Sequence, residues 1–187
     1  MRASGILLPI SSLPAKYGIG CFSKEAYEFV DFLKNAGQKY WQILPIGPTS
    51  YGDSPYQSFS TFAGNPYFIS LEDLIEQRLL TEKECDKADF GKDESSVDYE
   101  KLYRERFKLL RKAYERSGIS ERENFHRFRE ENSFWLRDYA IFMAVNTGQK
   151  ISGFVGAIPW SIIRENCITR LSFMSLFNMS FTDNGFG

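Results

Sequence analysis

The fold of this chain is decided by Tyr40-Trp41-Gln42-Ile43-Leu44-Pro45-Ile46-Gly47-Pro48-Thr49-Ser50-Tyr51-Gly52-Asp53-Ser54-Pro55-Tyr56-Gln57-Ser58-Phe59-Ser60. Its first part, residues 40–46, is an apolar run with aromatic and branched side chains, bounded by glycine and proline. This pattern is typical of a fully buried strand, although periodicity alone leaves a helical segment open. The second part is rich in Gly, Pro, Ser, Asp and Tyr, and its glycines and prolines exclude a helix. The stretch therefore predicts a strand followed by a shaped loop.

Three large rings lie on the predicted loop, from Tyr51, Tyr56 and Phe59, beside serine, aspartate and glutamine side chains. A pyranose has an apolar C–H face and a polar rim, so this mixture of groups is suited to binding a sugar. The alternative is a surface loop whose rings fold back into the core, and the residue chemistry leaves both interpretations open.

A helix and an earlier strand precede this stretch. Residues 5–10 predict a first buried strand, and Ser23 is a good N-cap for a helix whose apolar residues recur at helical spacing until Gly37. Strand, helix and strand form one β-α-β unit, which requires a parallel pair and a right-handed crossover. In parallel sheets the loops at the carboxyl ends of the strands carry the site, so we expect the loops after Ile10 and Ile46 to form it.

The loop sequence also resembles a known family. Tyr51-Gly52-Asp53-Ser54-Pro55-Tyr56-Gln57, continued by Ser58-Phe59-Ser60-x-Phe62-Ala63-Gly64-Asn65-Pro66-Tyr67, is similar to the signature of 4-alpha-glucanotransferases, the amylomaltase or disproportionating-enzyme family. Two later segments resemble the same family, Val97-Asp98-Tyr99-x-x-Leu102-Tyr103 and Phe134-Trp135-Leu136-x-Asp138-Tyr139-Ala140-x-Phe142-Met143-Ala144. The resemblance runs to about Val145. For the last segment the spacing of the apolar residues favours ordinary core packing.

The resemblance implies an α/β fold, a partial TIM-type (β/α)8 barrel with a helical insertion. Residues 1–80 are then the first two β/α units of the barrel and residues 81–146 the insertion. The local pattern agrees with helices there. Ser70 and Thr81 are expected N-caps of short helices, the first over residues 71–79, and Asp98 leads a long helix that Gly118 ends. Ser120 forms a predicted capping box with Glu123 ahead of a further helical segment.

The resemblance also implies a site. Ser54 and Tyr56 face the sugar beside the scissile bond, with Tyr56 as a stacking platform, and Asp53 and Pro55 of the same motif are also expected to bind the substrate. Tyr51 and Tyr103 match tyrosines of a second glucan-binding site. The implied partner is a maltooligosaccharide or a starch- or glycogen-type alpha-1,4-glucan, and the transfer needs no metal and no organic cofactor.

The family's enzymes transfer a glucan segment with retention of configuration. Two carboxyl groups ~5–5.5 Å apart act on the bond, one as nucleophile and one as acid and base. By the resemblance those acids lie on later barrel strands, so no catalytic residue is assigned in this chain, and Asp53 matches the sugar loop rather than the nucleophile. We therefore expect an amino-terminal part of a glucanotransferase that is inactive in isolation. The alternative is a non-catalytic glucan-binding fragment or the product of a pseudogene.

Residues 147–187 depart from the pattern, as a string of low charge without clear period. A shift of one base would let Ile168–Gly187 encode a segment similar to an amphipathic helix of the family. We expect an aberrant, frameshifted tail, the alternative being a genuine divergent one.

Composition narrows the remaining classes. Lys+Arg 23 against Asp+Glu 24 gives a net charge of -1, which provides no electrostatic case for nucleic acid or an acidic membrane surface. The three cysteines are scattered and indicate neither a zinc site nor a disulfide framework. His126 is the single histidine and is expected on a solvated helix face. The apolar run at residues 6–10 is too short for a signal or membrane segment, so a cytoplasmic protein is expected.

Overall fold

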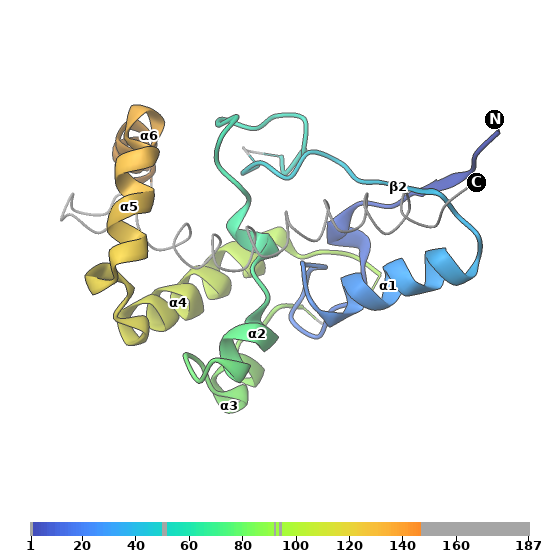
Figure 1. Ribbon diagram of the computed structural model, residues 1–187. Coiled ribbons are helices and arrows are strands. Elements are labelled where there is room, and N and C mark those ends of the chain that lie inside the picture. Colours follow the sequence, from blue (N-terminus) through green and yellow to red (C-terminus); the bar gives the residue numbers. More distant parts are fainter. Residues whose placement is uncertain (1, 50–51, 92, 94, 147–187) are drawn as a thin grey trace.

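The computed structural model describes residues 2–49, 52–91, 93 and 95–146 (Figure 1). The predicted frameshifted tail and Tyr51 lie outside these residues. In Figure 1 the strand pair and its helix lie at one end of the molecule, the last two helices lie at the other, and a long helix lies between them.

The predicted β-α-β unit is confirmed. Strand β1 (Gly5–Leu7) pairs in parallel with β2 (Tyr40–Gln42), and Gly5 faces Tyr40 in the register. Between the strands, α1 (Lys24–Asn35) begins after Ser23, as predicted, but the Ser23 hydroxyl caps no backbone N–H and donates to the Glu25 carboxylate instead. Gly5 is needed for the close approach of the strands, because a Cβ there would lie 2.5 Å from the Tyr40 carbonyl oxygen.

The prediction that these strands are fully buried is wrong for the described residues, and both strands are shorter than expected. Ile6, Leu7 and Tyr40 are 41%, 56% and 65% exposed. Pro9 and Pro45 lack the N–H that would continue the ladder. Helix α1 covers part of one face, where Phe29 meets Trp41 edge to face at 5.0 Å. A parallel pair is normally covered on both faces and continued by further strands, and the described residues form two strands only.

The main core lies away from the sheet. It is formed by α2 (Leu71–Glu76), α3 (Glu82–Asp86) and α4 (Tyr99–Ser117) together with the turn around Tyr17, the segment around Tyr67 and the buried side chains of the last two helices, Phe128, Trp135 and Leu136. Its most deeply buried members are Leu71, Leu74, Leu80, Cys85, Leu102, Leu110 and Ala113. A smaller cluster of Ile10, Leu13 and Ala26 lies between α1 and the loop after β1.

Most helix starts follow the sequence. The Ser70 hydroxyl accepts from Asp73 N–H at 3.0 Å, the Asp98 carboxylate accepts from Lys101 N–H at 3.1 Å, and Thr81 forms a full capping box with Glu84. Gly118 ends α4 with φ 58°. Helix α2 stops at Glu76, short of the predicted Leu79, because Arg78 adopts φ 60°.

The capping box predicted at Ser120 is wrong. A 3-10 helix, η3 (Ile119–Glu121), follows α4 and contains Ser120, so α5 (Glu123–Glu131) begins after Arg122 without a side-chain cap. The remaining elements are the 3-10 helices η1 (Ile10–Ser12) and η2 (Pro66–Phe68) and the last helix, α6 (Ser133–Asn146). Within the described part of the chain, no helix combines the length and the apolar character needed to cross a membrane.

Candidate functional site

The predicted loop is closed at its base. Asn65 N–H donates to the Ile46 carbonyl at 2.8 Å, and Thr49 and Ser58 form an antiparallel bridge. Gly47 permits this closure, because a Cβ there would lie 2.5 Å from Ser58 Oγ. We call residues 47–65 the glucan loop, after the family resemblance of its sequence.

The tip of the glucan loop turns sharply and presents one ring to solvent. Gly52 and Asp53 have φ of 94° and 55°, and Gln57 N–H donates to the Ser54 carbonyl at 3.0 Å. The Tyr56 ring is 73% exposed. The interpretation that the loop's rings fold back into the core is therefore wrong for Tyr56.

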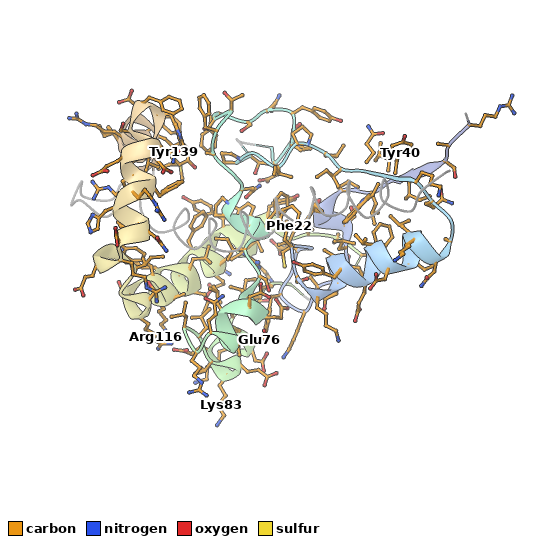
Figure 2. All side chains as sticks on the ribbon, in the orientation of Figure 1. Phe22, Tyr40, Glu76, Lys83, Arg116 and Tyr139 are labelled. Carbon is orange, nitrogen blue, oxygen red and sulfur yellow. The ribbon has the colours of Figure 1, made fainter. Side chains whose placement is uncertain are left out.

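Phe59 and Phe62 behave differently, because both pack against α6. The Phe59 ring stacks on Tyr139 with centroids 6.2 Å apart, and Phe62 stacks on Trp135 at 5.7 Å. Figure 2 shows Tyr139 on the side of α6 that faces the loop. Core packing of the α6 segment is confirmed for Trp135, whereas Phe134 is 69% exposed.

A small cavity of about 30 Å³ lies where the loops after the two strands meet. Pro9, Ile10 and Ser11 line it from the end of β1, and Leu44 and Pro45 from the end of β2. The glucan loop adds Thr49, Asp53, Pro55 and Asn65, and α4 adds Tyr99. The two unusual loops therefore meet at the carboxyl ends of the strands, where the sequence predicts the site.

Asp53 is the acidic residue of this lining, and among the described residues no lysine or arginine lines the cavity with it. Burial raises the pKa of Asp53, and a long hydrogen bond of 3.4 Å from the Thr49 hydroxyl opposes the shift. Burial also raises the pKa of Tyr67 and of Tyr99, and the Asp53 charge adds to both shifts. Both phenols therefore lie within electrostatic range of the Asp53 carboxylate.

Tyr103 lies outside the cavity. It projects from α4 with 53% of its surface exposed and meets the Phe107 ring edge to face at 5.3 Å. Phe107 in turn meets Tyr67 at 5.9 Å, so Tyr103 is the solvent-exposed end of a row of rings leading towards the glucan loop. The structure thus brings Asp53, Ser54, Pro55 and Tyr56 together on one loop and leaves Tyr103 on a separate element.

Sequence reasoning missed Arg106, which is 1% exposed and holds the neighbourhood of the site together. Its Nη1 donates to the Tyr17 carbonyl at 3.1 Å, and its Nη2 donates to the Ile69 carbonyl. A signal was present, because Arg106 follows Leu102 by four residues and precedes Leu110 by four, which puts it on the apolar stripe of α4. Thr49, Asn65, Tyr67 and Tyr99 were also missed as neighbours of Asp53, and no pattern in the sequence links them.

The groups gathered here are a carboxyl group, hydroxyls and aromatic rings. Among the described residues no cluster of His, Cys, Asp or Glu could hold a metal ion. His126 is exposed on α5. Beside the cavity, the glucan loop offers the exposed Tyr56 ring and the Ser54 hydroxyl, two groups that match the face and the rim of a sugar.

Comparisons of this chain with known proteins all give matches to one family. A family model described as 4-alpha-glucanotransferase matches residues 8–162, which extends past α6. A 4-alpha-glucanotransferase of Clostridium butyricum is 55% identical over 136 residues, which cover 73% of this chain and 28% of that protein. The Thermus thermophilus 4-alpha-glucanotransferase is 46% identical over 164 residues, covering 86% of this chain and 31% of the relative.

Among solved structures, an amylomaltase from Streptococcus agalactiae in complex with acarbose superimposes with a TM-score of 0.72 at 42% identity. The match covers 79% of this chain and 30% of that one. The chain therefore spans less than a third of the length of these relatives.

Proposed function

Because the chain belongs to the 4-alpha-glucanotransferase family, we propose that it is the amino-terminal part of an enzyme that transfers alpha-1,4-glucan segments to an acceptor sugar with retention. Its substrate is a maltooligosaccharide or a starch- or glycogen-type glucan. The observation that carries the proposal is the exposed Tyr56 ring, held beside Ser54 on a closed loop at the carboxyl ends of β1 and β2.

In this proposal Tyr56 stacks on the apolar face of a glucose unit while the Ser54 hydroxyl bonds its rim. Such a stack contributes on the order of 1 kcal/mol beyond area burial, by analogy with aromatic pairs. Tyr51 and Tyr103 bind a second stretch of glucan away from the cavity. The exposure of the Tyr103 ring supports this role.

We further propose that β1, α1 and β2 begin a (β/α)8 barrel, so that residues 1–80 belong to the barrel, residues 81–146 to a helical insertion and residues 147–187 to a frameshifted tail. The open faces of the strand pair support the first of these assignments, because a barrel covers them with further strands and helices. The unpaired thiols of Cys21 and Cys85 are compatible with a cytoplasmic protein.

Catalysis needs a pair of carboxyl groups ~5–5.5 Å apart, one as nucleophile and one as acid and base. The cavity lining supplies one acid, Asp53. We assign the catalytic acids to barrel strands outside this polypeptide, which spans less than a third of its relatives. The 187-residue polypeptide by itself is then inactive.

The test is incubation of the pure 187-residue chain with maltotriose, with the Streptococcus agalactiae amylomaltase as positive control. We expect release of glucose and longer maltooligosaccharides in the control, and neither above blank with the chain. Disproportionation by the chain that survives repurification would overturn the assignment of the acids.

A second candidate is a non-catalytic glucan-binding chain, since the described lining of the cavity holds a single carboxyl group. Calorimetric titration with acarbose and with maltoheptaose tests binding separately from turnover. Binding that is lost in Tyr56→Ala supports the loop as the sugar site. A wild-type chain that binds neither sugar contradicts it.

A further inference from the structure

The Asp53 side chain has a different environment from that of Tyr56 on the same loop. Tyr56, three residues on, is 73% exposed, whereas Asp53 lines the cavity beneath the loop. Its carboxylate accepts a hydrogen bond from the Thr49 hydroxyl. The backbone of Thr49 in turn forms the antiparallel bridge with Ser58 at the base of the loop. The Asp53 side chain therefore contacts the base of the loop.

The backbone at this point restricts which residues fit. Gly52 and Asp53 both have positive φ, at 94° and 55°. Glycine adopts this region without cost, and Asp and Asn are the other residues that enter it most readily. Of these three types, Asp and Asn alone carry an oxygen that could accept the Thr49 hydroxyl.

The surroundings also suit an internal acceptor. The described lining of the cavity contains no cationic side chain that would draw Asp53 into an ion pair, and it provides the hydroxyl-bearing residues Ser11, Thr49 and Tyr99. Its volume of about 30 Å³ exceeds the ~10–15 Å³ that one water molecule needs and is far below the ~150 Å³ of a cavity that holds a six-membered ring. The groups at this cavity can therefore order the loop, while a sugar has to bind above it.

From these contacts we infer that Asp53 is a positioning residue of the glucan loop: its carboxylate holds the tip down over the cavity through Thr49, so that Ser54 and Tyr56 are presented outward. Asp53 makes no contact of its own with the sugar. This inference rests on the proposed function for the meaning of the loop, and it is tested by a readout that needs no sugar.

The experiment measures amide hydrogen exchange of the 187-residue chain without ligand, at one pH, for wild type, Asp53→Asn, Asp53→Ala and Asp53→Gly. The reporters are the Gln57 and Asn65 amides, whose bonds to Ser54 and Ile46 close the tip and the base. Asp31→Asn, an exposed carboxylate on α1, is the matched control. Acarbose affinity is then measured for the same proteins and for Tyr56→Ala.

We expect Asp53→Ala and Asp53→Gly to speed exchange of both reporters by about fivefold, the effect of losing one hydrogen bond worth ~1 kcal/mol. Asp53→Asn should stay within about twofold of wild type, since the amide oxygen still accepts and Asn tolerates this backbone. Amides of α4 and the Asp31→Asn protein should not change. Tyr56→Ala should lose acarbose binding with unaltered exchange.

Two other outcomes would overturn the positioning role of Asp53, and a third would overturn the proposed function alone. If Asp53→Gly behaves as wild type, the backbone conformation and not the carboxylate sets the loop, and the positioning role is overturned. Weakened acarbose binding with unchanged exchange in every Asp53 variant would make Asp53 a sugar ligand, which also overturns it. If exchange responds as expected but wild type binds no acarbose, Asp53 positions the loop and the proposed function fails.

Discussion

Arg106 places a guanidinium inside the core without a carboxylate among its described hydrogen-bond partners. Two carbonyl oxygens, of Tyr17 and Ile69, accept from it, and its Nε is buried without a partner within the described structure. Burial lowers the pKa of Arg106, because the low-dielectric interior disfavours the charged form. On folding, the guanidinium loses its hydration and gains two charge-assisted hydrogen bonds. These bonds connect α4 to the β1–α1 connection and to the segment before α2.

The planar fork of Arg106 is expected to matter more than its charge. Arg106→Lys keeps the desolvation cost but a single ammonium cannot serve both carbonyls, whereas Arg106→Met removes the charge and keeps the volume. Each orphaned carbonyl costs about 1–3 kcal/mol. We expect both variants to lower the free energy of unfolding in urea, because each leaves at least one of the two carbonyls without its donor. The exposed Arg104→Met is the control and should be near neutral; an Arg106→Met protein as stable as wild type would contradict this role.

Tyr103 offers the second residue-scale prediction. Its ring is half exposed and touches Phe107 by an edge, so its removal takes little from the core. Tyr103→Ala should weaken binding of long glucans by about fivefold to tenfold, from ~1–1.4 kcal/mol of lost stacking, and shift the melting temperature by about a degree or two. Tyr27→Ala on α1 is the matched control. A large fall in melting temperature at unchanged affinity would identify Tyr103 as a packing residue.

For single residues, the sequence predicted the exposure of a side chain better than its contacts with residues distant in the chain. The exposure of Tyr103 follows from helical spacing, because Leu102 and Leu110 fill the buried stripe of α4. The gathering of Asp53, Tyr67 and Tyr99 depends on how α4 crosses the glucan loop. No local pattern encodes that crossing, and so these neighbours could not be predicted.

Among the elements, helix ends were predicted well where a side chain makes the cap. Thr81 with Glu84 and Asp98 with Lys101 N–H are contacts within one turn, so four residues of sequence determine them. Ser120 failed because the 3-10 helix after Gly118 competes for the same residues. The predicted strand lengths were wrong because the ladder ends at Leu7 and Gln42, before the prolines that lie inside both apolar runs.

Glu84 joins α3 to α4 and gives the element-scale prediction. Arg116 binds its carboxylate through two nitrogens, each at 2.8 Å, and Lys112 lies 3.3 Å away. Figure 2 shows Arg116 at the far end of α4. Hydrogen bonds from Arg116, with help from Thr81, lower the pKa of Glu84. A lowered folded-state pKa means that the stabilisation is present above the unfolded value of about 4.3 and is lost as pH falls through the folded value.

Glu84→Gln keeps the capping box, because glutamine also serves at that position, and removes only the charge. We expect its melting temperature to lie about a degree or two below wild type at pH 7, since exposed pairs contribute little. The difference should shrink progressively as pH falls below about 4.3 and should also shrink in 1 M salt. Glu28→Gln, in an exposed pair with Lys24, is the control. A difference that is independent of pH would contradict the ion-pair explanation.

For the whole molecule, the sequence predicted the topology but not the burial of the strand pair. Topology follows from local signals, namely two apolar runs and a capped helix between them. Burial depends on neighbours that the described residues do not include, so Ile6, Leu7 and Tyr40 remain open to solvent. Figure 2 shows Tyr40 at this outer edge of the molecule.

We therefore expect the pure chain to associate and to bind a dye specific for apolar surface, because open edges and apolar patches promote pairing between copies. Leu7→Lys should reduce both effects several-fold by placing a charge on the edge. Gln42→Lys adds the same charge to the same sheet without removing apolar surface, and should reduce them less. A monodisperse monomer without dye binding in light scattering would contradict the expectation.

The Arg106 contacts also imply an order in which the chain can fold while it is being synthesised. Strands β1 and β2 can pair once Gln42 has left the ribosome. The Tyr17 carbonyl, however, cannot form its hydrogen bond until Arg106, 89 residues further along, has been synthesised. At about 5–20 residues per second, α4 follows β2 by several seconds. During that interval the turn at Tyr17 and the glucan loop are already made but lack the helix that fixes them. The nascent chain thus exposes the glucan loop before α4 can fix its shape.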